Sequence, residues 1–253
     1  MKTRRLTAIF VFAAGLTAAS CGGDDDRALS RVFTAPPWTG DERNTYRLVD
    51  EGGDLYGTCV LETDVDAEPG KTRLNRLCAN EPLYRDDGTV LAESGTLVPI
   101  ESSRARSDAE NDKRVVLTSR YDPPLVRFEF DENGDIRRTE RELPQPDERS
   151  PEPGYYDDES LLWLVRGIRL EEGYQGAYAN VSAATGQTFT VGVRVEGIET
   201  VKVPAGEFRA WKVRITAAAA TQYAWVEAEG AHRLVRARIA GIEDVIYELT
   251  GSE

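Results

Sequence analysis

The sequence is poor in the residues on which most catalytic and metal-binding sites depend. It contains one histidine, His232, and three cysteines in 253 residues. A Ser-His-Asp or Cys-His device would have to use His232, and no nucleophile motif accompanies it. Zinc-ligand spacing, an EF-hand loop and a glycine-rich phosphate loop are all missing. We therefore expect that the protein is not an enzyme and binds no metal ion or cofactor. The carboxylates are so numerous that the sequence does not exclude a catalytic pair of the glycosidase type.

An excess of basic charge is also missing. Lys and Arg number 31 against 44 Asp and Glu, which gives a formal net charge of −13. A chain with this charge has no electrostatic attraction for nucleic acid or for anionic lipid. We expect no nucleic-acid partner, and we interpret the charge chiefly as a contribution to solubility.

No hydrophobic run is long enough to span a bilayer. The apolar stretch at residues 6–19 is too short for a transmembrane helix, follows three basic residues and ends in Ala-Ala-Ser-Cys. This ending resembles the lipobox of bacterial lipoproteins. We predict that residues 1–20 are a lipoprotein signal peptide and that lipidated Cys21 is a membrane anchor. The protein is then exported to the cell envelope, on the periplasmic or another extracytoplasmic side. An ordinary secretory signal followed by an incidental cysteine is the alternative.

The other two cysteines are predicted to form a disulfide. In an exported chain an even pair of thiols favours a bridge. Cys59 and Cys78 lie on two strand-like runs around the Ala-Glu-Pro-Gly turn at residues 67–70. A bridge across this hairpin would close a loop of about 20 residues and stabilise the fold by roughly 3 kcal/mol. Metal binding by two lone thiols has less support, because no histidine or second cysteine pair lies near them.

The pattern of the last third of the chain predicts an antiparallel meander. Residues 192–249 form short β-branched and aromatic runs that alternate apolar with charged residues. One face of such a strand would carry Trp211, Val213 and Ile215, and the other would carry Lys212, Arg214 and Thr216.

Turn signals divide the rest of the chain. Asn133-Gly134 predicts a type I′ hairpin whose charged second arm is an exposed strand. We interpret Asp-Asp-Gly at residues 86–88 as a turn and the polar residues 104–112 as a long hairpin loop. The predicted organisation is a flexible tether at residues 21–44 and one antiparallel β domain at residues 45–253. Its about twelve strands would form a half-barrel or an open barrel, and Phe33 and Trp38 would dock on it.

One short helix is predicted near residues 157–167. Three acidic residues at its start suit the positive end of the helix dipole, and Leu161, Leu164 and Val165 share one face. So short a helix needs packing to hold it, most simply across the concave side of a curved sheet. It would be either a core plug or a movable lid over an apolar cavity.

Two segments resemble a family of bacterial exported β-proteins of unknown function. The first is D-D-E-S-L-L-W-L-V-R-G-I-R-L-E-E-G-Y at residues 157–174. The second is V-E-G-I-E-T-V-K-V-P-A-G-E-F-R-A-W-K-V at residues 195–213, followed by A-W-V-E-A-E-G-A-H-R-L-V-R. The family has a helix before an E-x-V-x-V-P-A-G-x-F turn and a W-x-A-x-G-x-x-L-V hairpin, from which residues 225–235 depart in spacing. The resemblance implies a strongly curved antiparallel sheet like that of the lipoprotein carriers, with a helical lid. It brings no catalytic residues.

Three functions compete at this point. The first is a carrier that binds an apolar ligand such as a lipid in the half-barrel. The second is a structural or assembly lipoprotein that binds another envelope protein, and the third is an enzyme, for which no site is evident. An open cavity would favour the carrier, and an exposed apolar patch would favour the assembly protein. The residues predicted to line the carrier's cavity are Leu161, Trp163, Leu164, Trp211, Val213, Tyr223 and Trp225.

Overall fold

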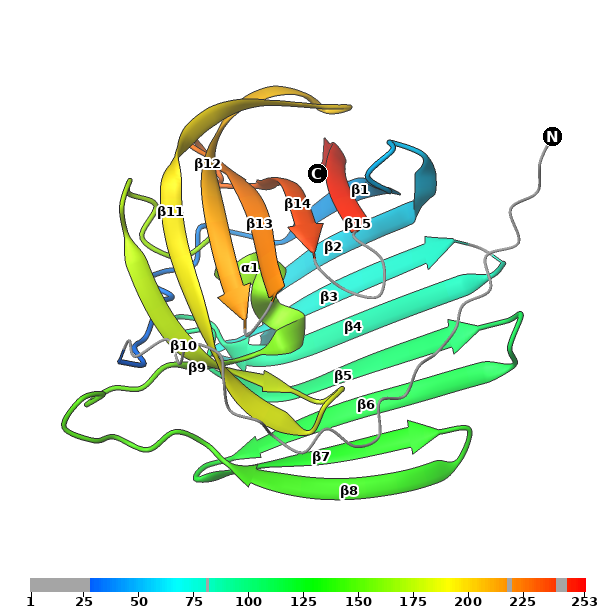
Figure 1. Cartoon of the computed structure of the whole chain (residues 1–253), viewed down its shortest axis with the longest axis vertical. Coiled ribbons are helices and arrows are strands. Elements are labelled where there is room, and N and C mark those ends of the chain that lie inside the picture. The colour runs from blue at the N-terminus through cyan, green and yellow to red at the C-terminus, as the bar shows by residue number, and fades with distance from the viewer. Residues whose placement is uncertain (1–27, 81, 218–219, 240–244) are drawn as a thin grey trace.

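A single open sheet of 15 strands dominates the structure, a computed structural model that describes residues 28–80, 82–217, 220–239 and 245–253. The sheet is strongly curved and antiparallel, except that its last edge strand runs parallel to its neighbour. The predicted fold class is therefore confirmed (Figure 1). The predicted signal peptide and Cys21 lie outside the described residues.

The strand order shows two meanders joined edge to edge. From one edge to the other it is β8-β7-β6-β5-β4-β3-β2-β1-β15-β14-β13-β12-β11-β10-β9. The two meanders therefore meet where β1 pairs with β15. The bounds are β1 Glu42–Val49, β2 Leu55–Glu68, β3 Lys71–Asn80, β4 Tyr84–Glu93, β5 Pro99–Asp108, β6 Lys113–Asp122, β7 Leu125–Glu132, β8 Asp135–Glu142, β9 Tyr155–Asp157, β10 Gln175–Ser182, β11 Gln187–Val203, β12 Gly206–Ala217, β13 Ala220–Glu227, β14 Leu234–Ile239 and β15 Val245–Ser252.

Several predicted turns are present. Asn133 and Gly134 have φ values of 52° and 91°, as a type I′ turn requires, and they join β7 to the exposed edge strand β8. Gly206, at φ 138°, follows Pro204 in the turn between β11 and β12. The C-terminal strands β11–β15 form the predicted meander in chain order.

Two polar stretches predicted to be turn or loop are strands instead. Residues 86–88 lie inside β4, and β5 continues to Asp108, which leaves only residues 109–112 as its connection to β6. Gly88 is explained by close approach, because a Cβ built on it would lie 2.5 Å from Glu159 Oε2. Ion pairs between neighbouring strands stabilise the charged residues of β4 and β5. This stabilisation comes from tertiary contacts, so local turn propensity does not predict it.

Part of the predicted tether belongs to the domain. Phe33 forms a β-bridge with Ile168, and both Phe33 and Trp38 are buried, as their predicted docking required. The first strand then begins at Glu42. The structured region thus starts well before residue 45, because these aromatic side chains bury their apolar surface against the sheet and the segment after the helix.

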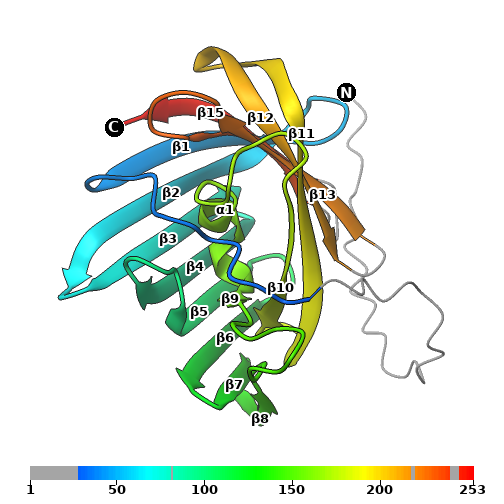
Figure 2. The same ribbon diagram turned by 90° about the vertical axis from the view of Figure 1, so that its left-hand side faces the viewer.

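The helical segment lies on the concave side of the sheet. It consists of a 3₁₀ turn, η1 (Asp158–Ser160), and the short helix α1 (Leu161–Leu164). Figures 1 and 2 show α1 between β2–β4 and the opposing C-terminal strands. Trp163 and Leu164 are at most 1 % exposed and belong to a core cluster that includes Leu74 and Val213. Among the described residues, no helix is long and apolar enough to cross a membrane.

Candidate functional site

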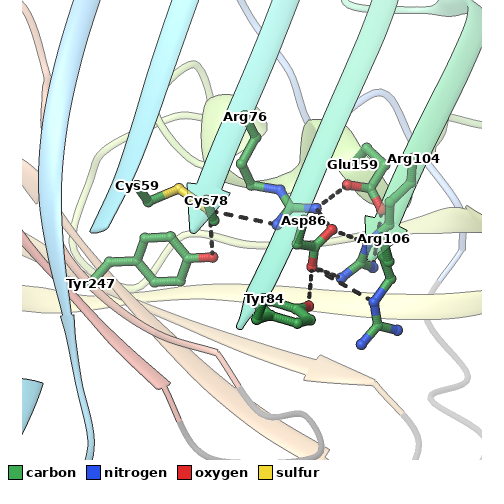
Figure 3. Close-up of a disulfide and its surroundings, with 9 residues drawn as sticks. All are labelled: Cys59, Arg76, Cys78, Tyr84, Asp86, Arg104, Arg106, Glu159 and Tyr247. Carbon is green, nitrogen blue, oxygen red and sulfur yellow. Dashed lines mark hydrogen bonds and ion pairs between the residues drawn. A yellow bond between two sulfur atoms is a disulfide. The ribbon is translucent and has the colours of Figure 1, made fainter. Parts of the chain in front are cut away.

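Glu159, the last of the three acidic residues before α1, meets two largely buried arginines, Arg76 on β3 and Arg104 on β5. Glu159 accepts hydrogen bonds from Arg76 Nη2 at 2.6 Å and from Arg104 Nη1 at 3.2 Å. Asp86 binds the same two arginines, and Arg104 donates to it through both Nε (2.7 Å) and Nη2 (2.5 Å). Figure 3 shows how Glu159 and Asp86 face each other across these guanidinium groups. We call these four residues the anchor network.

Mutual neutralisation allows these charges to be buried. Burial by itself would raise the pKa of Asp86, but the hydrogen bond from Arg104 and the charge of Arg76 hold it well below its usual range. Burial and the nearby Asp86 charge raise the pKa of Tyr84 to about 12, so its hydroxyl stays protonated and donates to Asp86 Oδ2. The anchor network connects the start of the helical segment to β3, β4 and β5, so its role is structural.

The neighbouring carboxyl, Asp157, is bound by neutral donors only. Its Oδ2 accepts from Ser102 Oγ and Tyr121 OH, both at 2.5 Å, while its Oδ1 caps the 3₁₀ turn through Glu159 N. Burial raises the pKa of Asp157 to about 7, although the hydrogen bonds from Ser102 and Tyr121 oppose this rise. A protonated Asp157 is therefore well suited to this place near neutral pH.

We predict that Asp157 makes the protein less stable as pH rises. Its folded pKa of about 7 exceeds its ordinary value of 3.8, so the native state binds more protons between these two pH values. Its contribution to the unfolding free energy is complete below pH 4 and is lost as pH rises through 7. Urea unfolding from pH 4 to 8 should show Asp157→Asn gaining stability relative to the wild type with rising pH. The exposed control Asp50→Asn should run parallel to the wild type. Parallel curves for both variants would show that Asp157 does not titrate differently in the folded state.

The seven residues predicted to line an apolar cavity are not brought together in one. Trp163, Leu164 and Val213 are fully packed in the core, and Leu161 and Trp211 pack against it. Tyr223 and Trp225 point to the other face, because they are the cross-strand partners of Arg214 and Lys212. There Lys212 Nζ lies 5.0 Å from the Tyr223 ring and 5.9 Å from the Trp225 ring. The set is therefore divided between a filled core and an outer surface.

The two cysteines and the histidine singled out in the sequence contact other protein groups. Cys59 and Cys78 stand directly opposite each other on β2 and β3 and form the predicted disulfide, with an S–S length of 2.05 Å. His232 lies in a turn at φ 47°, its Nδ1 is 2.9 Å from Glu227 O, and its carbonyl accepts from Arg166. In the described part of the chain, no group of three or more His, Cys, Asp or Glu side chains is arranged to hold a metal ion.

A large hollow lies on the outer face of β3–β8. Its volume is about 780 Å³. Ser102 and Ser119 point inward, where Ser102 holds Asp157, so Ser103 and Thr118 point outward by strand alternation. We call this feature the outer hollow; the outward-facing side chains that line it are Arg73, Thr89, Leu91, Glu101, Ser103, Thr118, Arg120, Arg127, Glu129, Arg138 and Glu140.

Sequence reasoning missed both the anchor network and the outer hollow. The available signal was alternation: residues 101–106 read Glu-Ser-Ser-Arg-Ala-Arg, which is compatible with a strand that has two polar faces. Such a strand does not resemble the half-apolar pattern used to find sheets, and its polar residues favoured a loop.

The family follows from a comparison of sequences. Residues 82–244 match the profile of DUF3108, a family of proteins of unknown function. The chain belongs to this family. The DUF3108 region contains β4–β8, and so most of the outer hollow, together with the helical segment and the strands through β14. The resemblance to an uncharacterised exported β-protein family is thereby confirmed. No curated protein matches the sequence.

One solved structure shows the same kind of fold. A β-barrel-like protein of the DUF1849 family from Brucella abortus superposes with a TM-score of 0.51 at 10 % identity, over 85 % of this chain and 97 % of that one. A candidate lipoprotein from Parabacteroides distasonis (TM-score 0.30, 11 % identity) and a candidate exported protein with a YmcC-like fold from Bacteroides fragilis (0.28, 16 %) each match over 88 % of this chain and 99 % of theirs. At 10 % identity the first likeness concerns the fold alone, and the TM-scores of the other two are too low to establish a shared fold.

Proposed function

We propose that this DUF3108 protein is an exported, lipid-anchored, non-catalytic protein of the cell envelope that binds a polar ligand in the outer hollow. The observation that carries the proposal is the hollow itself, whose volume of about 780 Å³ lies within the range of ligand sites. Apart from Leu91, its outward-facing walls are charged and hydroxyl-bearing side chains, so polar contacts would decide what binds there.

An apolar ligand has less support. The helix residues expected to contact it are packed against the sheet, with Trp163 1 % exposed and Leu164 fully buried. The buried carboxylates also favour binding over catalysis, because Asp86, Asp157 and Glu159 are each hydrogen-bonded by protein groups. They therefore hold the fold together and offer no free acid–base pair to a substrate.

Native mass spectrometry of the full chain, extracted from its own host membrane in detergent, tests the binding proposal. We expect a polar ligand to accompany the wild-type protein and to be lost from Thr118→Trp, because the indole would fill the floor of the outer hollow. Thr200→Trp, at an exposed position on β11, is the matched control and should retain the ligand. An empty wild-type protein, or an acyl lipid that Trp163→Ala alone releases, would reject the proposal in favour of a protein partner or a carrier.

Lipid anchoring is predicted from Cys21 and has its own test. The wild-type chain should incorporate labelled palmitate and sediment with membranes, because two or three acyl chains hold a protein far better than one. Cys21→Ser should lose the label and the membrane association. If the wild type is never labelled, an ordinary secretory signal is the correct interpretation. A label that persists in Cys21→Ser would place the acyl group on another residue and reject Cys21 as the anchor.

A further inference from the structure

Two arginines of like charge face each other in the outer hollow. The register of β6 and β7 places Arg120 directly opposite Arg127. Like charges at such a pair are unfavourable unless something lies between them to neutralise them. Arg127 is partly compensated by Asp122 at 2.9 Å and by Glu140 at 3.7 Å. Arg120 is exposed and has no hydrogen-bond or ion-pair partner among the residues that the structure describes.

A row of small hydroxyl side chains runs beside this pair. Ser103 and Thr118 are direct cross-strand partners, and Thr118 lies two residues before Arg120 on the same face of β6. In the described ranges, neither hydroxyl is hydrogen-bonded to another protein group. The row continues to Glu129 on β7, which is opposite Thr118 and is held at 2.8 Å by Arg138. The row therefore offers two hydroxyls that can both donate and accept, followed by a carboxylate that accepts.

The charge of the outer hollow differs in sign from that of the chain. Its lining contains four arginines and three glutamates, whereas the whole chain carries −13. Arg120 and Arg127 would attract an anionic group, and a guanidinium binds a carboxylate or phosphate through two parallel hydrogen bonds. The glutamates and hydroxyls can pair with sugar hydroxyls, because each sugar hydroxyl both donates and accepts.

We propose that the outer hollow binds an anionic saccharide, with its acidic group between Arg120 and Arg127 and its hydroxyls on Ser103, Thr118 and Glu129. This inference rests on the proposed function and names its ligand class. The anion removes the repulsion between the two guanidinium groups, and the hydroxyl row fixes the orientation of the sugar ring. Glu101, opposite Arg120 on β5, bounds the site on the other side.

Calorimetric titration of the full chain in detergent with trigalacturonate tests the inference. The fully methyl-esterified trimer is the matched probe, because it keeps the size and hydroxyls but lacks the charges. We expect the acid to bind and the ester to bind at least tenfold more weakly. Arg120→Gln and Arg127→Gln should each weaken binding of the acid at least tenfold, in line with the loss of a charge-assisted hydrogen bond. Arg209→Gln on β12, an equal change of charge at an exposed arginine, should not weaken it.

Three results would overturn the inference. They are no binding of the acid, equal binding of the acid and the ester, and equal losses in Arg120→Gln and Arg209→Gln. Displacement of the trimer by inorganic phosphate at the same concentration would also overturn it, because the site would then bind simple anions and would not recognise the sugar. If trigalacturonate fails while Thr118→Trp still removes a polar ligand in the native spectrum, only the saccharide assignment is wrong. If both experiments fail, the proposed function is wrong as well.

Discussion

Glu159→Gln is expected to destabilise the protein by about 3–5 kcal/mol, because it removes one carboxylate from a buried ion-pair network. Arg76 and Arg104 would then share Asp86 alone, in surroundings where the side chains of Arg76 and Glu159 are each 10 % exposed. The attraction of Glu159 and Asp86 keeps the pKa of Arg76 well above its usual value in spite of burial, which shows how strongly the charges are coupled. Urea unfolding at constant pH, with the disulfide intact, gives the free-energy difference.

The control for this prediction is Glu207→Gln. Glu207 pairs with Lys202 at 3.1 Å on the surface, where the two side chains are 57 % and 80 % exposed. Exposed pairs are screened by water and contribute little, so its unfolding midpoint should barely change. If the two variants behaved alike, the anchor network would be effectively solvated, and packing alone would hold the helical segment in place.

Trp163→Ala is expected to cost a similar amount, about 3–5 kcal/mol, by leaving a cavity in the core. The indole is 1 % exposed, and its Nε1 donates to Thr63 Oγ1 at 3.0 Å. Truncation therefore also leaves a buried hydroxyl without its partner. Trp163→Phe keeps most of the ring volume and loses only the hydrogen bond, so its unfolding free energy should lie between those of the wild type and Trp163→Ala.

This experiment also decides between the two roles foreseen for the helix. A core plug is part of the folded state and must be destabilised by Trp163→Ala, whereas a lid that opens freely would lose little stability. Trp225→Ala provides the comparison, because this tryptophan lies partly exposed on the outer face beneath Lys212 and Arg236. A loss for Trp163→Ala no larger than that for Trp225→Ala would favour the lid.

The limits of sequence reasoning are clearest on β4 and β5. Asp-Asp-Gly at residues 86–88 has the composition of a turn, yet two of the three residues meet a distant partner: Arg104 binds Asp86, and Glu159 occupies the space beside Gly88. The outer hollow was missed for a related reason. Its lining joins residues of six strands through register, and register between two-sided polar strands cannot be deduced from an apolar stripe.

The sequence by itself determined the class of fold, the C-terminal meander, the Asn133-Gly134 hairpin and the Cys59–Cys78 bridge. These features depend on side-chain period, on positive φ, or on two thiols placed about equally far from one turn, and all are local. Only the tertiary structure decided that Trp163 fills the core, that Tyr223 and Trp225 face outward, and that β4 and β5 are strands. Those outcomes depend on which residues distant in the chain meet across the curved sheet, because a buried charge or an indole is stabilised by its partner and not by its sequence neighbours.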